Sequence, residues 1–218
     1  MHLRQNGITD KNVLAAIERV PRELFVPESF RDQAYEDIAL PIGFGQTISQ
    51  PTVVGFMSER LMPNKKAKVL EVGTGSGYQA AILSKLFRRV YTIERHRDLL
   101  KSAEKKFKEL RLNNIVPLWA DGVIGWPEQS PFDRIILTAG LERVPAVLFD
   151  QLAVGGYLIA PVGKAGADQK LLCYKKDWVG HRAKTDDYYS TYAIYDNQNG
   201  NTTSNKIVCS NFFAHKKY

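Results

Sequence analysis

The most constraining feature of the sequence is a regular alternation of strand-like and helix-like segments between residues 67 and 163. The strand-like segments are short and mostly apolar, as expected for strands that are buried on both faces of a parallel sheet. They are residues 67–72, 89–93, 114–120, 133–139 and 156–162. Segments with helical spacing lie between them, so right-handed crossover connections are expected. The alternation therefore predicts a doubly wound α/β fold with a mostly parallel sheet.

The residues before this region predict two helices and an irregular segment between them. Thr9 or Asp10 can cap the first helix, which Pro21 ends. Pro51 suits the first turn of the second helix. Residues 21–50 contain prolines, glycines and aromatic residues without a sustained period, so we expect an irregular segment lying over a larger core. One further strand is expected at residues 170–175.

Length and composition limit the function classes. The 218 residues suffice for one domain with an appended segment. The chain has no uncharged apolar run long enough to span a membrane, and its first residues lack the apolar stretch of a secretory signal. The two cysteines, Cys173 and Cys209, lie far apart and without metal-ligand spacing, so free thiols are expected. We therefore expect a cytoplasmic protein with no membrane segment and no metal.

A glycine-rich motif follows the first strand of the alternating region. In VLEVGTGSGY, residues 69–78, Gly73, Gly75 and Gly77 permit a sharp turn and a close approach of a ligand to the backbone. Glu94 follows the second strand, where an acid can accept hydrogen bonds from a ribose diol. The alternative role for Glu94 is to cap the next helix. The motif therefore predicts a nucleoside site at the carboxyl end of the first strand.

The details of the motif select the nucleoside. The glycines do not form the G-x-G-x-x-G pattern of dinucleotide sites, and no lysine follows them as in a P-loop. Asp121 and Gly122 follow the third strand and are placed to hold an adenine edge. An adenosine without phosphates remains, and S-adenosylmethionine is the common cofactor of that kind. Glu71 and Thr74, within the same strand and turn, are further candidate cofactor contacts.

A second group of candidate residues lies in ALPIGFGQTISQP, residues 39–51. The motif precedes a helix N-terminus, which favours a carboxylate, so Ser49 is a candidate substrate contact. Spacing alone favours the simpler role, in which Ser49 or Gln50 caps the helix. A covalent role for Ser49 is not expected, because no G-x-S-x-G motif surrounds it and the four histidines offer no evident partner.

At these residues the sequence resembles the protein-L-isoaspartate O-methyltransferase family, whose members methylate isoaspartyl residues of damaged proteins. The resemblance runs from about residue 7 to residue 162. Its most specific pieces are VPRELFVPE (20–28), ALPIGFGQTISQPTVVGFM (39–57), LEVGTGSGYQAAIL (70–83) and DGVIGWPEQSPFDRIILTAG (121–140). It implies a Rossmann-like α/β fold of the S-adenosylmethionine-dependent methyltransferase type.

The resemblance also implies residue roles. Ser49 corresponds to the family's active-site serine, and Thr47, Ile48 and Ser49 would approach both cofactor and substrate. The loop of Gly73, Gly75 and Gly77, together with Glu94, would hold the methionine and ribose portions of the cofactor. Asp121 and Gly122 would lie near the adenine, and Thr138 and Ala139 would line the substrate site. The implied product is S-adenosylhomocysteine, and the implied partners are isoaspartyl-containing proteins and peptides, bound by a monomer.

The resemblance suggests a division of the chain into three parts. Residues 1–50 would form an N-terminal helix and a substrate-side segment packed on the core, and residues 51–175 the methyltransferase α/β core. Residues 176–218 form a divergent tail, expected to be partly disordered. Where the family has a hydrophobic V-R-F-V-P-L type strand, residues 178–205 read WVGHRAKTDDYYSTYAIYDNQNGNTTSN. Divergence and an altered reading frame would both produce this change.

Two alternative functions remain open at this stage. The net charge of +7 and the aromatic residues of the tail are compatible with a nucleic-acid methyltransferase. LTAG, residues 137–140, however, replaces the Asn/Asp-Pro-Pro-aromatic motif of amino methyltransferases, so nucleic acid is disfavoured as a partner. The other alternative is a homologue that binds the cofactor but is catalytically impaired, because of its unusual tail.

Overall fold

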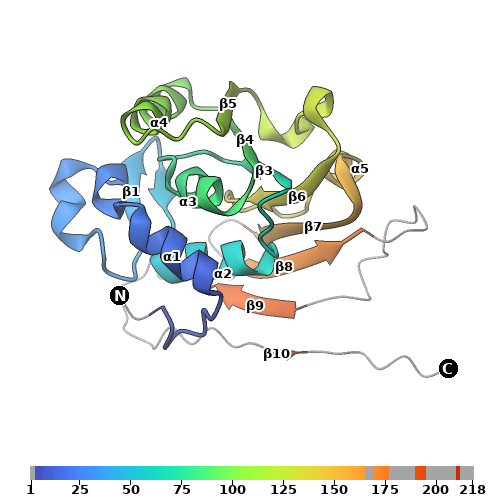
Figure 1. Cartoon of the computed structure of the whole chain (residues 1–218), viewed down its shortest axis with the longest axis horizontal. Helices are drawn as coiled ribbons and strands as arrows, with labels where there is room; N and C mark the ends of the chain where they lie inside the picture. The colour runs from blue at the N-terminus through green and yellow to red at the C-terminus, as the bar shows by residue number, and fades with distance from the viewer. Residues whose placement is uncertain (1–2, 165–168, 177–189, 195–209, 212–218) are drawn as a thin grey trace.

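The computed structural model describes residues 3–164, 169–176, 190–194 and 210–211 (Figure 1). In these residues the main sheet has eight strands in the order β10-β9-β8-β7-β6-β3-β4-β5. Their bounds are β3 Lys68–Val72, β4 Arg89–Glu94, β5 Ile115–Trp119, β6 Phe132–Leu137, β7 Leu152–Val162, β8 Gln169–Lys175, β9 Ser190–Ile194 and β10 Ser210–Asn211. Strands β3 to β7 are mutually parallel, and β8, β9 and β10 continue the sheet in antiparallel pairs. The predicted α/β fold with a mostly parallel sheet is confirmed.

The order of the parallel strands decides where a ligand can bind. The chain runs outward from β3 through β4 to β5, and then crosses to the other side of β3 to form β6 and β7. Each pair is in parallel register, for example Val72 beside both Ile93 and Leu137. The connection after β3 therefore runs to one side of the sheet, toward β4, and the connection after β6 runs to the other side, toward β7. An open crevice is left above the carboxyl ends of β3 and β6.

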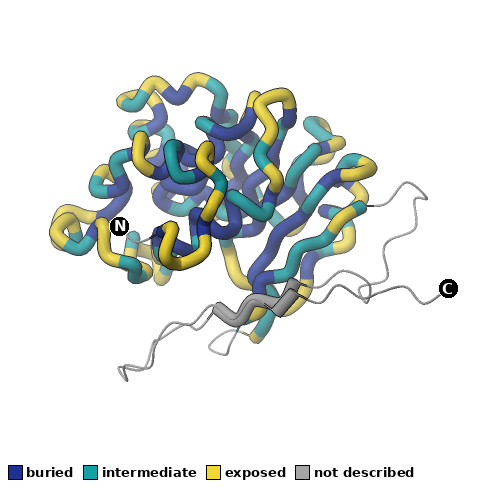
Figure 2. Tube along the Cα trace, turned by 60° about the horizontal axis from the view of Figure 1, so that its bottom comes forward, coloured by how far each residue is buried: buried dark blue, intermediate teal, exposed yellow. Residues whose placement is uncertain are grey.

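Helices cover both faces of the sheet. They are α1 Lys11–Arg19, α2 Pro51–Arg60, α3 Tyr78–Leu86, α4 Arg97–Glu109 and the short α5 Ala146–Asp150, with short 3₁₀ turns η1 Arg22–Phe25, η2 Glu28–Gln33, η3 Gly122–Ile124 and η4 Pro127–Gln129. Side chains of α1, α2 and α3 form one core with Val69 and Ile136 of the sheet. Leu148 of α5 joins Leu70 and Ile135 in a second core on the other face. Figure 2 shows the buried positions concentrated along the strands, with exposed positions on the connecting segments.

The main difference from the sequence-based expectation lies in residues 21–50. The segment packs on the core as expected, with Phe25 and Leu40 buried, but it is not irregular throughout. Strands β1 Leu40–Gly43 and β2 Gln46–Ile48 form a separate antiparallel hairpin. Its tip requires left-handed backbone at Phe44 (φ 53°) and Gly45 (φ 67°). The expectation was wrong here because each strand is too short to show a period.

Other expectations concern the residues after β7. The predicted strand at 170–175 is confirmed as β8, and Cys173 is a free thiol. Cys209 and most of the altered stretch 178–205 lie outside the described residues. No helix among the described residues is long and apolar enough to cross a membrane. The same residues contain no group of three or more His, Cys, Asp or Glu side chains arranged to hold a metal ion.

One carboxyl group lies inside the first core. Glu71 of β3 is fully buried, and its Oε2 accepts a hydrogen bond from the Thr92 hydroxyl, which also pairs with the Thr74 hydroxyl at 2.6 Å. Its Oε1 has no hydrogen-bond partner among the described residues. Burial raises the pKa of Glu71 to about 8; the bond from Thr92 opposes this shift and the charge of Glu94 adds to it. Glu71 is therefore held protonated beneath the glycine turn at neutral pH.

This burial makes stability depend on pH. Because the pKa of Glu71 is raised in the folded state, its contribution to stability is complete below the ordinary value of 4.5 and is lost as pH rises through about 8. We expect Glu71→Gln to flatten this dependence, so that the variant gains thermal stability relative to the wild type at alkaline pH. Thermal unfolding at several pH values measures the difference. The exposed substitution Glu128→Gln is the control, and a Glu71→Gln curve parallel to the wild type would contradict the assignment.

Candidate active site

A cavity of about 470 Å³ opens above the carboxyl ends of β3, β4 and β6. A smaller hollow of about 60 Å³ adjoins it and shares Thr47, Ser49, Gly73 and Glu94 with it. The larger cavity is also lined by Asp121, Gly122, Thr138 and Ala139, and the smaller one by Ile48, Thr74 and Gly75. The structure thus brings together all the predicted site residues except Glu71 and Gly77, which line neither space.

The glycines of the turn after β3 have different roles. Gly73 has φ 105°, and a Cβ there would lie 2.5 Å from Oγ1 of Thr138. This glycine therefore keeps the β3 turn close to the β6 end. Gly77 has φ 91°, and its Cβ would lie 2.8 Å from Cε1 of Phe107 on α4. Gly77 accordingly permits close packing of α3 on α4, whereas Gly73 and Gly75 face the cavities.

Glu94 joins the glycine turn to the end of β4. Its carboxylate is buried, with Oε2 accepting the Gly75 N–H at 2.8 Å and Oε1 accepting the His96 N–H at 2.9 Å. His96 is the cap residue of α4, so the alternative role of supporting the next helix is also present. Each carboxylate oxygen can accept a further bond. Glu94 can therefore hold the turn and still receive a hydroxyl donor from the cavity.

The loop after β5 supplies the second acid. Asp121 caps η3, with Oδ1 accepting the Val123 N–H at 3.0 Å. Gly122 lies so close to β3 that a Cβ would meet Cγ1 of Val72 at 2.3 Å. This contact brings the loop against the end of β3, so that Asp121 and Glu94 line the same cavity.

The wall opposite the glycine turn comes from β2 and the start of α2. Thr47 and Ser49 line both hollows, and the Ser49 hydroxyl makes no hydrogen bond with the described part of the chain. The expectation that Ser49 or Gln50 caps α2 is wrong, because neither side chain makes a cap bond. The cap comes from Asp37, whose Oδ1 accepts the Thr52 N–H at 2.9 Å. Ser49 is thus left available to a ligand.

Thr138 and Ala139 close the cavity at the end of β6. The Thr138 hydroxyl donates to the carbonyl oxygen of Val72 at 3.0 Å, so it ties β6 to the β3 turn. Because the Thr138 hydroxyl is already bound to this carbonyl, the backbone around Ala139 forms the cavity wall at the end of β6.

Sequence reasoning missed several residues of the site. Gln46 lies on the unpredicted hairpin, and Gln169 begins β8. Arg95 contributes the only basic side chain among the described residues that line the larger cavity. Its position directly after Glu94 was a usable signal, because residues just beyond a parallel strand lie at the ligand edge. No local signal marked Gln46 or Gln169.

The lining suits an adenosyl group without phosphates. The volume lies within the usual range for small-ligand sites. Two carboxylates, Glu94 and Asp121, line it and would repel a pyrophosphate, whereas they can accept hydrogen bonds from hydroxyl and amino groups. The positively charged sulfonium of S-adenosylmethionine is compatible with these acids.

Comparisons with known proteins place the chain in a family. Residues 1–195 match the model of the protein-L-isoaspartate(D-aspartate) O-methyltransferase family. A protein-L-isoaspartate O-methyltransferase of Rhodospirillum centenum is 58% identical over 181 residues, which cover 83% of this chain and 82% of that protein. Its counterpart in Parvibaculum lavamentivorans is 59% identical over 174 residues, covering 79% of this chain and 78% of that protein.

Solved structures give the same result. A protein-L-isoaspartate O-methyltransferase structure superposes with a TM-score of 0.73 at 31% identity, over 89% of this chain and 61% of that chain. A putative protein-L-isoaspartate O-methyltransferase from Plasmodium falciparum, solved in complex with S-adenosyl-L-homocysteine, has a TM-score of 0.70 at 26% identity, over 80% of this chain and 86% of that chain. This chain therefore belongs to the protein-L-isoaspartate(D-aspartate) O-methyltransferase family.

Proposed function

We propose that the chain transfers a methyl group from S-adenosylmethionine to the free carboxylate of L-isoaspartyl residues in damaged proteins and peptides. The observation that carries the proposal is the convergence of two walls on one cavity. One wall holds the glycine turn with Glu94 and Asp121, and the other holds Thr47 and Ser49. Family membership supplies the reaction class. We also propose that the enzyme is a monomer, that it is cytoplasmic and that it does not act on nucleic acid.

The first wall would hold the cofactor, which supplies an activated methyl group on a sulfonium. Gly73 and Gly75 line the hollows without side chains, so their backbone can lie directly against a ligand. Glu94 has acceptor capacity left for the ribose hydroxyls, and Asp121 with Gly122 would lie at the adenine end. Glu71 does not line the cavity, so its contribution would pass through Thr92 and Thr74 to the turn.

The second wall would orient the substrate. The free carboxyl of an isoaspartyl residue is its α-carboxyl, and such groups have a pKa of about 3.3 to 3.7, so it is ionised at neutral pH and needs no general base. Ser49 can donate a hydrogen bond to one carboxylate oxygen and thereby direct the other toward the methyl group. Orientation of two reactants alone can lower a barrier by about 7 kcal/mol. The backbone amide nitrogen would then attack the ester carbonyl spontaneously, releasing methanol and closing a succinimide, whose hydrolysis by water returns part of the residue to normal aspartate.

The proposal is tested directly with an isoaspartyl peptide. We expect methyl transfer from labelled S-adenosylmethionine to this peptide and none to the peptide of identical sequence with normal aspartate. Binding of S-adenosylhomocysteine is followed separately by thermal shift. Binding without turnover would instead identify a catalytically impaired homologue. Methylation of RNA, with binding that weakens steeply as salt increases, would favour the nucleic-acid alternative.

A second prediction concerns Ser49. Ser49→Ala removes one hydrogen bond to a charged group, so we expect transition-state stabilisation to fall by about 1.5 to 3 kcal/mol. The affinity for S-adenosylhomocysteine should change less. Steady-state kinetics with the isoaspartyl peptide measures the loss, with Ser102→Ala on the exposed face of α4 as control. Unchanged turnover in Ser49→Ala would remove Ser49 from the mechanism.

A third prediction separates the cofactor wall from the substrate wall. Glu94→Gln removes one carboxylate oxygen proposed to accept the ribose hydroxyls, so S-adenosylhomocysteine affinity should fall by about 10-fold or more. Isothermal titration calorimetry measures this change. Equal affinity in Glu94→Gln and wild type would show that Glu94 serves only the backbone of the turn and α4.

A further inference from the structure

Asp37 lies between η2 and β1, far from Ser49 in sequence, and reaches across to the start of α2. Its Oδ1 accepts the Thr52 N–H at 2.9 Å, and its Oδ2 accepts the Thr52 hydroxyl at 2.6 Å. The Thr52 oxygen in turn accepts a hydrogen bond from Nδ2 of Asn6 at 2.9 Å. Thr52 is only 2% exposed, so water cannot replace these bonds without opening the structure. Asp37 therefore fixes the first turn of α2 through the backbone N–H and the hydroxyl of Thr52.

This arrangement is unusual for a helix start. A helix is ordinarily capped by the side chain of its own cap residue, most often Ser, Thr, Asp or Asn. The cap residue of α2 is Gln50, which makes no such bond, and Pro51 has no N–H to satisfy. Ser49 stands one residue earlier and would be the natural local substitute. Capping from outside by Asp37 leaves the Ser49 hydroxyl free to point into the cavity.

Asp37 is itself held in place from both sides. Arg22 is fully buried and donates from Nε to the carbonyl oxygen of Ala34 at 2.8 Å and from Nη2 to that of Ile38 at 3.5 Å. Its guanidinium also lies over the ring of Tyr78, 4.9 Å from the centroid, at the start of α3 directly after the glycine turn. The stretch that carries Asp37 is therefore fastened to the helix that follows the cofactor-binding turn.

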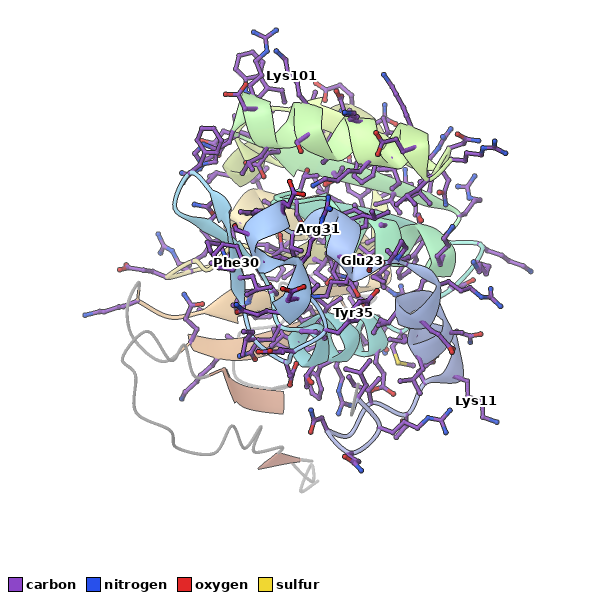
Figure 3. All side chains as sticks on the ribbon, turned by 90° about the vertical axis from the view of Figure 1, so that its left-hand side faces the viewer. Lys11, Glu23, Phe30, Arg31, Tyr35 and Lys101 are labelled. Carbon is purple, nitrogen blue, oxygen red and sulfur yellow. The ribbon has the colours of Figure 1, made fainter. Side chains whose placement is uncertain are left out.

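A second tie closes the same segment at the surface. The Tyr35 hydroxyl donates a hydrogen bond to Glu23 of η1, and Figure 3 shows these two labelled residues beside one another on the N-terminal segment. The backbone on either side of Asp37 is thus held to η1 by Arg22 and by Tyr35. A carboxylate on such a support can define the position of α2 relative to the cofactor wall.

We propose that Asp37 is a positioning residue for methyl transfer: through Thr52 it holds the Ser49 segment at a set distance from the glycine turn. This inference rests on the function proposed above. Asp37 does not line either hollow, so it acts on the reaction only through the backbone that carries Ser49. A displacement of a reacting group by about 1 Å can lower a rate by about 100-fold, so a remote anchor of this kind can control turnover.

The test compares two carboxylate caps in the same protein. Asp37→Ala removes the cap of α2, and Asp10→Ala removes the cap of α1, where Asp10 accepts the N–H groups of Asn12 and Val13. Both variants lose one helix cap, but only the first supports the Ser49 segment. With the isoaspartyl peptide, we expect kcat of Asp37→Ala to fall by about 10-fold to 100-fold. Asp10→Ala should keep the wild-type kcat at a temperature where both remain folded.

Thr52 variants keep the test independent of any folding defect in Asp37→Ala. Thr52→Val removes the hydroxyl donor, whereas Thr52→Ser retains it and should restore turnover. The double variant Asp37→Ala with Thr52→Val should lose little more than Asp37→Ala alone, because both residues act through one contact. If the fold-losses in kcat of the two single variants instead multiply in the double variant, the proposal is overturned.

Hydrogen exchange supplies a readout besides activity. Without any ligand, amides of residues 47–53 should exchange faster in Asp37→Ala than in wild type, and those of α4 should not change. Unchanged exchange, or wild-type kcat in Asp37→Ala, would overturn the positioning role while leaving the proposed function intact. A wild-type protein that does not methylate the isoaspartyl peptide would overturn the proposed function, and this inference with it.

Discussion

The parallel pairing of β3 with β4 on one side and with β6 on the other is the constraint on which the site depends. It places the ends of three strands, and the loops that follow them, at one edge of the sheet. The loops then interlock: Glu94 binds the Gly75 amide, Thr138 binds the Val72 carbonyl, and Gly122 packs on Val72. Each acid is held by backbone donors before any ligand arrives, which is the arrangement that favours binding without rearrangement.

The N-terminal segment completes what the sheet begins. A doubly wound sheet alone presents one wall of a crevice, and here the hairpin β1–β2 and the start of α2 provide the other. The two walls come from segments that lie apart in the sequence. Their relative position consequently depends on the buried guanidinium of Arg22 and the carboxylate of Asp37, which link the segment to α3 and α2.

Much of this architecture was predictable from local pattern. The five parallel strands, β8, the helix start at Pro51 and the glycine turn were all expected at or near their observed positions. The residues expected at the cofactor site line the two adjoining hollows, apart from Glu71 and Gly77. A packing role for Gly77 was not expected, because its neighbours Phe107 and Ala103 come from α4, and no local pattern reveals a helix–helix approach.

The amino-acid order by itself determined the strand and helix succession, the sharp turn after β3 and the acids at two strand ends. These features depend on periods, glycine backbone freedom and chain spacing, which are local properties. Only the tertiary structure decided that residues 40–48 form a hairpin, that Asp37 rather than Ser49 caps α2, and that Glu71 is buried away from the cavity. The strands of the hairpin are too short to show a period, whereas the cap from Asp37 and the burial of Glu71 depend on partners from other segments, which no short stretch of sequence contains.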